Sequence, residues 1–204
     1  MEDISLVTVV LMLPLLGVIP LLFVRSLTDQ TIKWLTLTVS LVTFGLSLLL
    51  LNNFDTNVAG LQMAQKWEWI SGNSFTISYY VGVDGISIWL VLLTTFIMPI
   101  EPIKQRVRLY YLFLLLMEWA MIGVFVAQDL FLFYVFWEVT LIPMYFLIGI
   151  WGSEDRIYAA IKFFLYTMAG SLLMLLAILW LGVEAGTFSL PDIFAQLNSG
   201  ELVL

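Results

Sequence analysis

Long apolar runs separated by short polar segments dominate the chain. A bilayer core about 30 Å thick needs roughly 20 apolar residues when the crossing segment is a helix. A transmembrane barrel strand would instead alternate apolar and polar residues, and this alternation is absent. Only helices and closed barrels satisfy the backbone inside hydrocarbon. The pattern therefore predicts an all-α, polytopic transmembrane helix bundle of about six spans, near 4–24, 32–51, 83–103, 109–127, 130–151 and 158–182.

The third predicted span is the weakest. Its uninterrupted apolar part runs from Ile86 to Ile100, and Pro99, Glu101 and Pro102 crowd its end. At 1.5 Å per residue, 83–103 would extend about 31 Å as a helix. This is long enough to cross if neighbouring helices accommodate the prolines.

Basic residues are distributed unequally between the two predicted sides. Lys66 is the only basic residue on one side. The other side holds Arg25, Lys33, Lys104, Arg106, Arg108, Arg156 and Lys162. Cytoplasmic loops are enriched in Lys and Arg, so this bias predicts an N-out and C-out topology. Glu2 and Asp3, rather than basic residues, precede the first run, which indicates a retained helix and not a secretory signal.

Two predicted external segments lie outside the spans. The loop 52–82 carries aromatic residues suited to the membrane interface, and we expect no strand in it. These aromatics are Trp67, Trp69, Tyr79 and Tyr80. The segment 183–204 includes apolar residues at helical spacing, which predicts the start of an interfacial amphipathic helix. They are Leu190, Ile193, Phe194 and Leu197.

Composition excludes several kinds of chemistry. The chain has 62% hydrophobic and 11% charged residues, a net charge of −7 and 8 basic residues, which disfavours nucleic-acid binding. Without cysteine, it can form neither a disulfide nor a cysteine-ligated iron–sulfur cluster. Without histidine, it lacks the commonest metal ligand. No glycine-rich dinucleotide motif follows a predicted strand, so any cofactor chemistry is expected on partner subunits.

Two glutamates fall within the predicted spans. Glu118 lies in the fourth span and Glu138 in the fifth, both roughly 12–13 Å deep at 1.5 Å per residue. A charged group at this depth is costly and rare, and is commonly functional. Both residues are therefore candidate proton-relay carboxylates. The alternative is that each one only forms hydrogen bonds that hold helices together.

Pro143 follows Glu138 by five positions in the same predicted helix. It cannot donate a hydrogen bond to the Val139 carbonyl and its ring crowds that group, so a bend just after the acid is expected. The freed carbonyl and the Thr140 hydroxyl would then offer water a place to bind near Glu138.

Other polar and small residues have simpler interpretations. Lys162 lies near a helix end, where a snorkelling anchor is favoured over a functional lysine. Asp129 and Asp84 precede helices and are interpreted as caps that also interact with the helix dipole. Three glycines are interpreted as close-packing points between helices: Gly123, Gly149 and Gly170.

The segments 79–87, 129–145 and 149–167 resemble chain M, or subunit 4, of NADH–quinone oxidoreductase, respiratory complex I. The resemblance implies an antiporter-like, proton-translocating membrane-arm subunit that works with other membrane-arm subunits in the lipid bilayer. It implies that Glu138 pairs with a lysine on a later helix, and that Glu118 lies along the same polar, hydrated axis. It also implies that NADH, FMN, iron–sulfur clusters and quinone bind to partner subunits. The corresponding membranes are the bacterial cell membrane, the mitochondrial inner membrane and the thylakoid.

The sequence departs from this family in two respects. Family members have roughly fourteen helices, so the partner lysine and later relay residues would lie beyond Leu204. The family also usually carries several more residues between 98–100 and the basic segment that starts at Lys104. Two alternatives therefore stay open beside the complex I subunit: a subunit of a multisubunit sodium/proton antiporter, and a truncated scaffold or assembly component.

Overall fold

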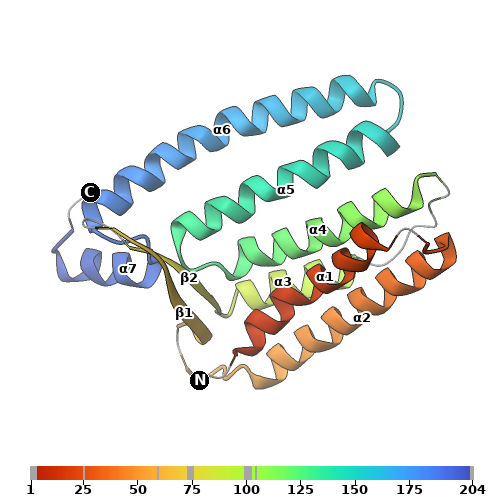
Figure 1. Cartoon of the computed structure of the whole chain (residues 1–204). Coiled ribbons are helices and arrows are strands. Elements are labelled where there is room, and N and C mark those ends of the chain that lie inside the picture. Colours follow the sequence, from red (N-terminus) through yellow and green to blue (C-terminus); the bar gives the residue numbers. More distant parts are fainter. Residues whose placement is uncertain are drawn as a thin grey trace.

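A computed structural model describes residues 4–24, 26–58, 60–72, 76–98, 103 and 105–202. Within these residues the chain forms seven helices and one two-stranded antiparallel sheet. Long helices run side by side, and the sheet and a short terminal helix lie together at one end of them (Figure 1). In chain order the elements are α1 Leu6–Phe23, α2 Asp29–Asn53, β1 Gln62–Ser71, β2 Thr76–Val83, α3 Ser87–Ile97, α4 Val107–Val126, α5 Leu130–Trp151, α6 Arg156–Ala185 and α7 Leu190–Ser199.

Five of these helices are long and apolar enough to cross a membrane: α1, α2, α4, α5 and α6. The prediction of a mostly helical, polytopic membrane protein is therefore confirmed. α3 has 11 residues, about 16 Å at 1.5 Å per residue, and is shorter than a full crossing. Pro99, Glu101, Pro102, Arg25 and Lys104 lie outside the described residues, as does the predicted continuation of the third span through them.

Packing divides the bundle into a tight part and an open part. α4 packs against α1, α2, α3 and α5, whereas the main packing partner of α6 is α5. One apolar core cluster joins α1, α4 and α5 to the sheet and centres on residues such as Leu11, Ile122 and Phe136. A second joins the opposite ends of α1, α2 and α4 around Leu115. α6 leaves most of its apolar side chains uncovered, which suits a helix that faces lipid.

β1 and β2 pair as the antiparallel strands of a β-hairpin, so the expectation of no strand in the external loop is wrong. In the hairpin, Trp67 pairs with Tyr79, and their rings stack with centroids 5.4 Å apart. Val83, which was predicted to begin the third span, ends β2 instead. Alternating apolar residues on a two-stranded sheet bury one face against the helices, and Ile77, Val81 and Val83 are accordingly buried.

The three predicted packing glycines differ. A Cβ added at Gly123 would overlap the ring of Phe136, so this glycine allows α4 and α5 to approach closely. At Gly149 an added Cβ would make an ordinary contact, 3.5 Å from Ala160 Cβ. At Gly170 it would meet no atom within 4 Å, so the prediction of close packing at this position is wrong.

Candidate functional site

Glu118 is completely buried in the interior of the bundle. Its side chain is 0% exposed, and the Ser40 hydroxyl on α2 donates a 3.0 Å hydrogen bond to its Oε2. Glu118 lies 11 positions after Val107, and Ser40 lies 11 positions after Asp29, so both sit about 16 Å from the same end of the bundle. The other oxygen, Oε1, has no hydrogen-bond partner among the described residues.

The face of α2 that meets Glu118 is lined by small hydroxyl side chains. Successive residues on it are three or four positions apart, so they share one helix face. All are at most 3% exposed: Thr36, Ser40, Thr43 and Ser47. Near the other end of this face, Ser47 Oγ and Thr95 Oγ1 of α3 are 2.9 Å apart and share a hydrogen bond. The sequence analysis missed this stripe, although its spacing is visible in the sequence.

Glu138 occupies a different helix interface. It is partly buried on α5, and its Oε1 is buried without a hydrogen-bond partner among the described residues. One turn earlier, the Tyr134 hydroxyl interacts with both Glu138 and Ser171 of α6. Neither Tyr134 nor Ser171 was identified from the sequence.

α5 continues as one helix through Pro143, from Leu130 to Trp151. The Thr140 hydroxyl donates a 2.7 Å hydrogen bond to the Trp137 carbonyl on the same helix. Thr140 is therefore satisfied locally, whereas Glu138 Oε1 is a buried side-chain oxygen without a hydrogen-bond partner among the described residues.

The two acids thus face different neighbours. Glu118 meets α2, whereas Glu138 lies with Tyr134 toward α6. In the part of the chain that the structure describes, no cation forms an ion pair with either acid. Buried carboxylates in hydrocarbon must be protonated, hydrated or paired. The charged form of either acid would therefore need a cation or water beside its carboxylate.

Asp129 caps α5 as predicted, whereas the prediction for Asp84 is wrong: the N-cap residue of α3 is Ile86, and Asp84 instead bonds the turn that precedes this helix. The Asp129 carboxylate accepts hydrogen bonds from Phe131 N and Leu132 N, at 2.9 and 3.1 Å, and from Ser78 N of β2 at 2.9 Å. Burial raises the pKa of Asp129, while the three N–H donors and the Lys66 charge act in the opposite direction. The Asp84 carboxylate accepts from Ser87 N and Ile86 N, and the Ser87 bond is the main reason that its pKa is lowered.

Lys162 points back toward the start of α6. Its exposed ammonium lies 5.6 Å from the centre of the Tyr158 ring, one turn earlier, in a cation–π contact. This geometry fits an anchor at the membrane surface.

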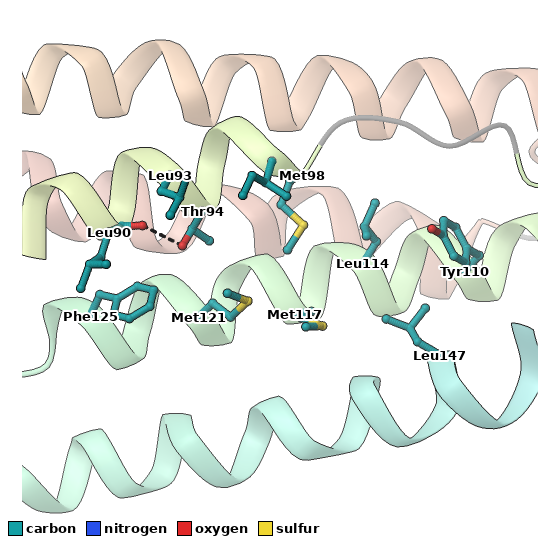
Figure 2. Close-up of a pocket in the computed structure, with 11 residues that line it drawn as sticks. Leu90, Leu93, Thr94, Met98, Tyr110, Leu114, Met117, Met121, Phe125 and Leu147 are labelled. Atoms are coloured by element: carbon teal, nitrogen blue, oxygen red, sulfur yellow. Dashed lines mark hydrogen bonds between the residues drawn. The ribbon is translucent and has the colours of Figure 1, made fainter. Parts of the chain in front are cut away.

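An apolar cavity of about 440 Å³ opens between α3, α4 and α5. Figure 2 shows its side chains converging from α3 and α4, with Leu147 added from α5. The Thr94 hydroxyl in its wall donates to the Leu90 carbonyl at 2.8 Å, and neither Glu118 nor Glu138 lines the space. The lining residues are Leu90, Leu93, Thr94, Ile97, Met98, Tyr110, Leu114, Met117, Met121, Phe125 and Leu147. The cavity is lined mainly by apolar side chains, and neither intramembrane glutamate is among them.

Among the described residues, no three Asp, Glu, His or Cys side chains gather into a group that could hold a metal ion. The chemistry that this part of the chain offers is therefore that of isolated carboxylates and hydroxyls within a membrane bundle.

The fold and the two acids define a polytopic membrane protein with carboxylates inside its helix bundle. Residues 127–204 match the family described as NADH:quinone oxidoreductase/Mrp antiporter. The chain is 51% identical to NADH-quinone oxidoreductase subunit M of Rhodobacter capsulatus over 164 residues, which cover 78% of this chain and 31% of that protein. It is 44% identical to NADH-ubiquinone oxidoreductase chain 4 of Arabidopsis thaliana over 184 residues, with 87% and 37% covered. Over the residues matched, the chain is similar to the membrane subunits of this family.

The solved structures agree. Respiratory complex I from Thermus thermophilus with bound NADH superposes with a TM-score of 0.75 at 29% identity, covering 93% of this chain and 39% of that one. The archaeal membrane-bound sulfane sulfur reductase reaches the same TM-score at 18% identity, and this match shows the fold alone. The chain spans roughly a third of the length of the curated relatives it matches first, from 31% to 40%.

Proposed function

We propose that this chain forms part of a proton-translocating membrane-arm subunit of NADH–quinone oxidoreductase, complex I. The observation that carries the proposal is a fully buried carboxylate, Glu118, on a membrane-crossing helix next to a second helix that also carries a carboxylate, Glu138. Relatives named as subunit M or chain 4 of this enzyme support the assignment.

In this proposal Glu138 is the carboxylate whose charge changes during the cycle. It is partly buried and keeps one buried oxygen free of hydrogen bonds, so a cation or water can approach that oxygen. Tyr134 connects it to Ser171 of α6 and holds its position. Glu118 is the secondary relay site, held by Ser40. NADH, FMN, iron–sulfur clusters and quinone would bind to partner subunits, and the redox reaction there would drive the proton movement.

The test is Glu138→Gln in the intact complex, reconstituted into vesicles. The amide keeps the size of the side chain and removes its ability to become charged. We expect most proton translocation per NADH oxidised to disappear while the complex still assembles. Glu154→Gln is the matched control, because Glu154 is exposed in the α5–α6 loop and should pump normally. Normal pumping by Glu138→Gln would overturn the relay role.

The family description also covers Mrp antiporters, which gives a second candidate: a subunit of a sodium/proton antiporter. The two functions differ in their driving force. Proton movement that responds to a sodium gradient in vesicles, with no electron donor present, would favour the antiporter. Movement that requires NADH and quinone would favour complex I.

A further inference from the structure

The hydroxyl stripe on α2 contains one residue that is bonded differently from the others. Threonines in apolar helices usually donate to a carbonyl of the preceding turn. Thr43 does so to Val39 at 2.9 Å, and Thr167 does so to Phe163 at 2.7 Å. Thr36 is 3% exposed, yet its Oγ1 has no hydrogen-bond partner among the described residues.

A second unpartnered atom belongs to the acid that the next residue of the stripe contacts. Ser40 is one turn from Thr36 on the same face and donates to Oε2 of Glu118, whose Oε1 is also buried and without a partner. Buried polar atoms in proteins are almost always satisfied, by protein or by water. If the stripe served only to hold helices together, these atoms would form hydrogen bonds between helices, as Ser47 of α2 and Thr95 of α3 do.

The stripe also leads toward an aqueous surface. Lys33 precedes Thr36 by three positions and is half-buried near the start of α2. From Asp29 to Thr36 the helix rises about 10 Å, and from Thr36 to Ser40 it rises about 6 Å more. Lys33, Thr36 and Ser40 thus form successive polar positions between the bundle end and Glu118.

We propose that the face of α2 marked by Thr36 and Ser40 is a proton-access route that connects Glu118 to the aqueous side next to Lys33. Water held at Thr36 Oγ1 would pass protons to Glu118 Oε1, while Ser40 fixes the carboxylate through its other oxygen. Glu118 would then exchange protons with this side through α2, without passing through Glu138. The route rests on the proposed proton-translocating function and adds the side from which its secondary relay site is reached.

The experiment uses three variants in the intact complex in vesicles. Thr36→Val keeps the shape of the side chain and removes the hydroxyl, and Thr36→Ser keeps the hydroxyl and removes a methyl group. Thr38→Val makes the same chemical change on the exposed face of the same helix. We expect Thr36→Val to slow NADH-driven proton translocation by about tenfold, Thr36→Ser to restore most of the rate, and Thr38→Val to match the wild type.

A second readout separates proton transfer from packing. If proton transfer through the stripe limits Thr36→Val, its pumping rate should show a larger solvent deuterium isotope effect than that of the wild type. A mere packing defect would slow Thr36→Ser as much as Thr36→Val and leave the isotope effect unchanged. That result would overturn the route.

Three further outcomes are decisive. A defect in Thr95→Val as large as that in Thr36→Val would place access at the hairpin end of the stripe and overturn the assignment. If Glu138→Gln abolishes pumping while Thr36→Val pumps normally, the α2 route is wrong and the proposed function stands. If Glu138→Gln pumps normally, the relay role of Glu138 is wrong, whatever the result for Thr36→Val.

Discussion

Asp129 shows how one side chain can join three parts of the fold. It caps α5 through Phe131 N and Leu132 N and also accepts a hydrogen bond from Ser78 of β2. Removing the carboxylate leaves these donors without an acceptor in a site that excludes water. We expect Asp129→Ala to lower the free energy of unfolding by about 2 kcal/mol, measured by denaturant titration in detergent.

Asp192→Ala is the control for this prediction. It breaks the ion pair in which Asp192 Oδ2 lies 3.0 Å from Lys66 Nζ. Both side chains of this pair are about half exposed. An exposed pair contributes about 0–1 kcal/mol. Equal losses from the two substitutions would contradict the view that the buried hydrogen bonds of Asp129 hold the hairpin to α5.

At the residue scale, one cap could be predicted from sequence and hydrogen-bond partners could not. An aspartate just before an apolar run indicates a cap, and Asp129 caps α5, whereas Asp84 lies one turn too early because α3 begins after Ile86. Glu118 could be identified as a buried acid because charge is rare in a span. Its partner Ser40 could not be identified, because Ser and Thr hydroxyls usually donate to carbonyls of their own helix and both residues are common in membrane spans. Only the packing of α2 against α4 shows which hydroxyl reaches the acid.

At the element scale, the contact between α4 and α5 depends on Gly123. An added methyl group would overlap the ring of Phe136, which is itself buried in the core. We expect Gly123→Ala to cost about 1–3 kcal/mol, as overpacking does, and to lower the thermal midpoint in detergent. Gly170→Ala on α6 is the control, because the new methyl group would meet no atom within 4 Å and should leave stability unchanged or slightly higher. Equal effects at both positions would contradict the packing role of Gly123.

The hairpin shows where element prediction fails. Aromatic residues such as Trp67 and Tyr79 suit both a membrane interface and a strand, so their presence does not distinguish the two. Strand pairing is a long-range interaction, and the residues that cover the sheet come from α1, α4 and α5. The long spans could be predicted because length and hydrophobicity act within each segment alone.

At the scale of the whole molecule, three hydrogen bonds indicate which helix ends share a side. Ser5 N, at the start of α1, donates to Gln65 of β1 at 3.1 Å. Gln128 N, between α4 and α5, donates to the Tyr80 carbonyl of β2 at 2.8 Å. Leu130 N, at the start of α5, donates to the Phe188 carbonyl beyond α6 at 2.8 Å. The hairpin is therefore on the side where α1 begins and α4 and α6 end.

This arrangement requires the chain between the hairpin and α4 to cross the bundle. β2 ends on the hairpin side at Val83, and α4 begins at Val107 on the opposite side. α3 supplies about 16 Å of that path. The basic residues at the start of α4 and α6, Arg106, Arg108 and Arg156, lie on the side away from the hairpin. Together with the positive-inside rule, this predicts six crossings with the hairpin outside.

The absence of cysteine from these 204 residues makes this topology directly testable, because each introduced thiol is the only one among them. Glu68 in β1 and Glu154 in the α5–α6 loop are both exposed. In intact cells, Glu68→Cys should react with a membrane-impermeant maleimide, and Glu154→Cys should react only after permeabilisation. The reverse pattern would contradict the N-out orientation, but it would still place Glu68 and Glu154 on opposite sides of the membrane. Labelling of both from outside would contradict that crossing, and would mean that the hydrogen bonds holding the hairpin to the α4–α5 junction do not form in the membrane.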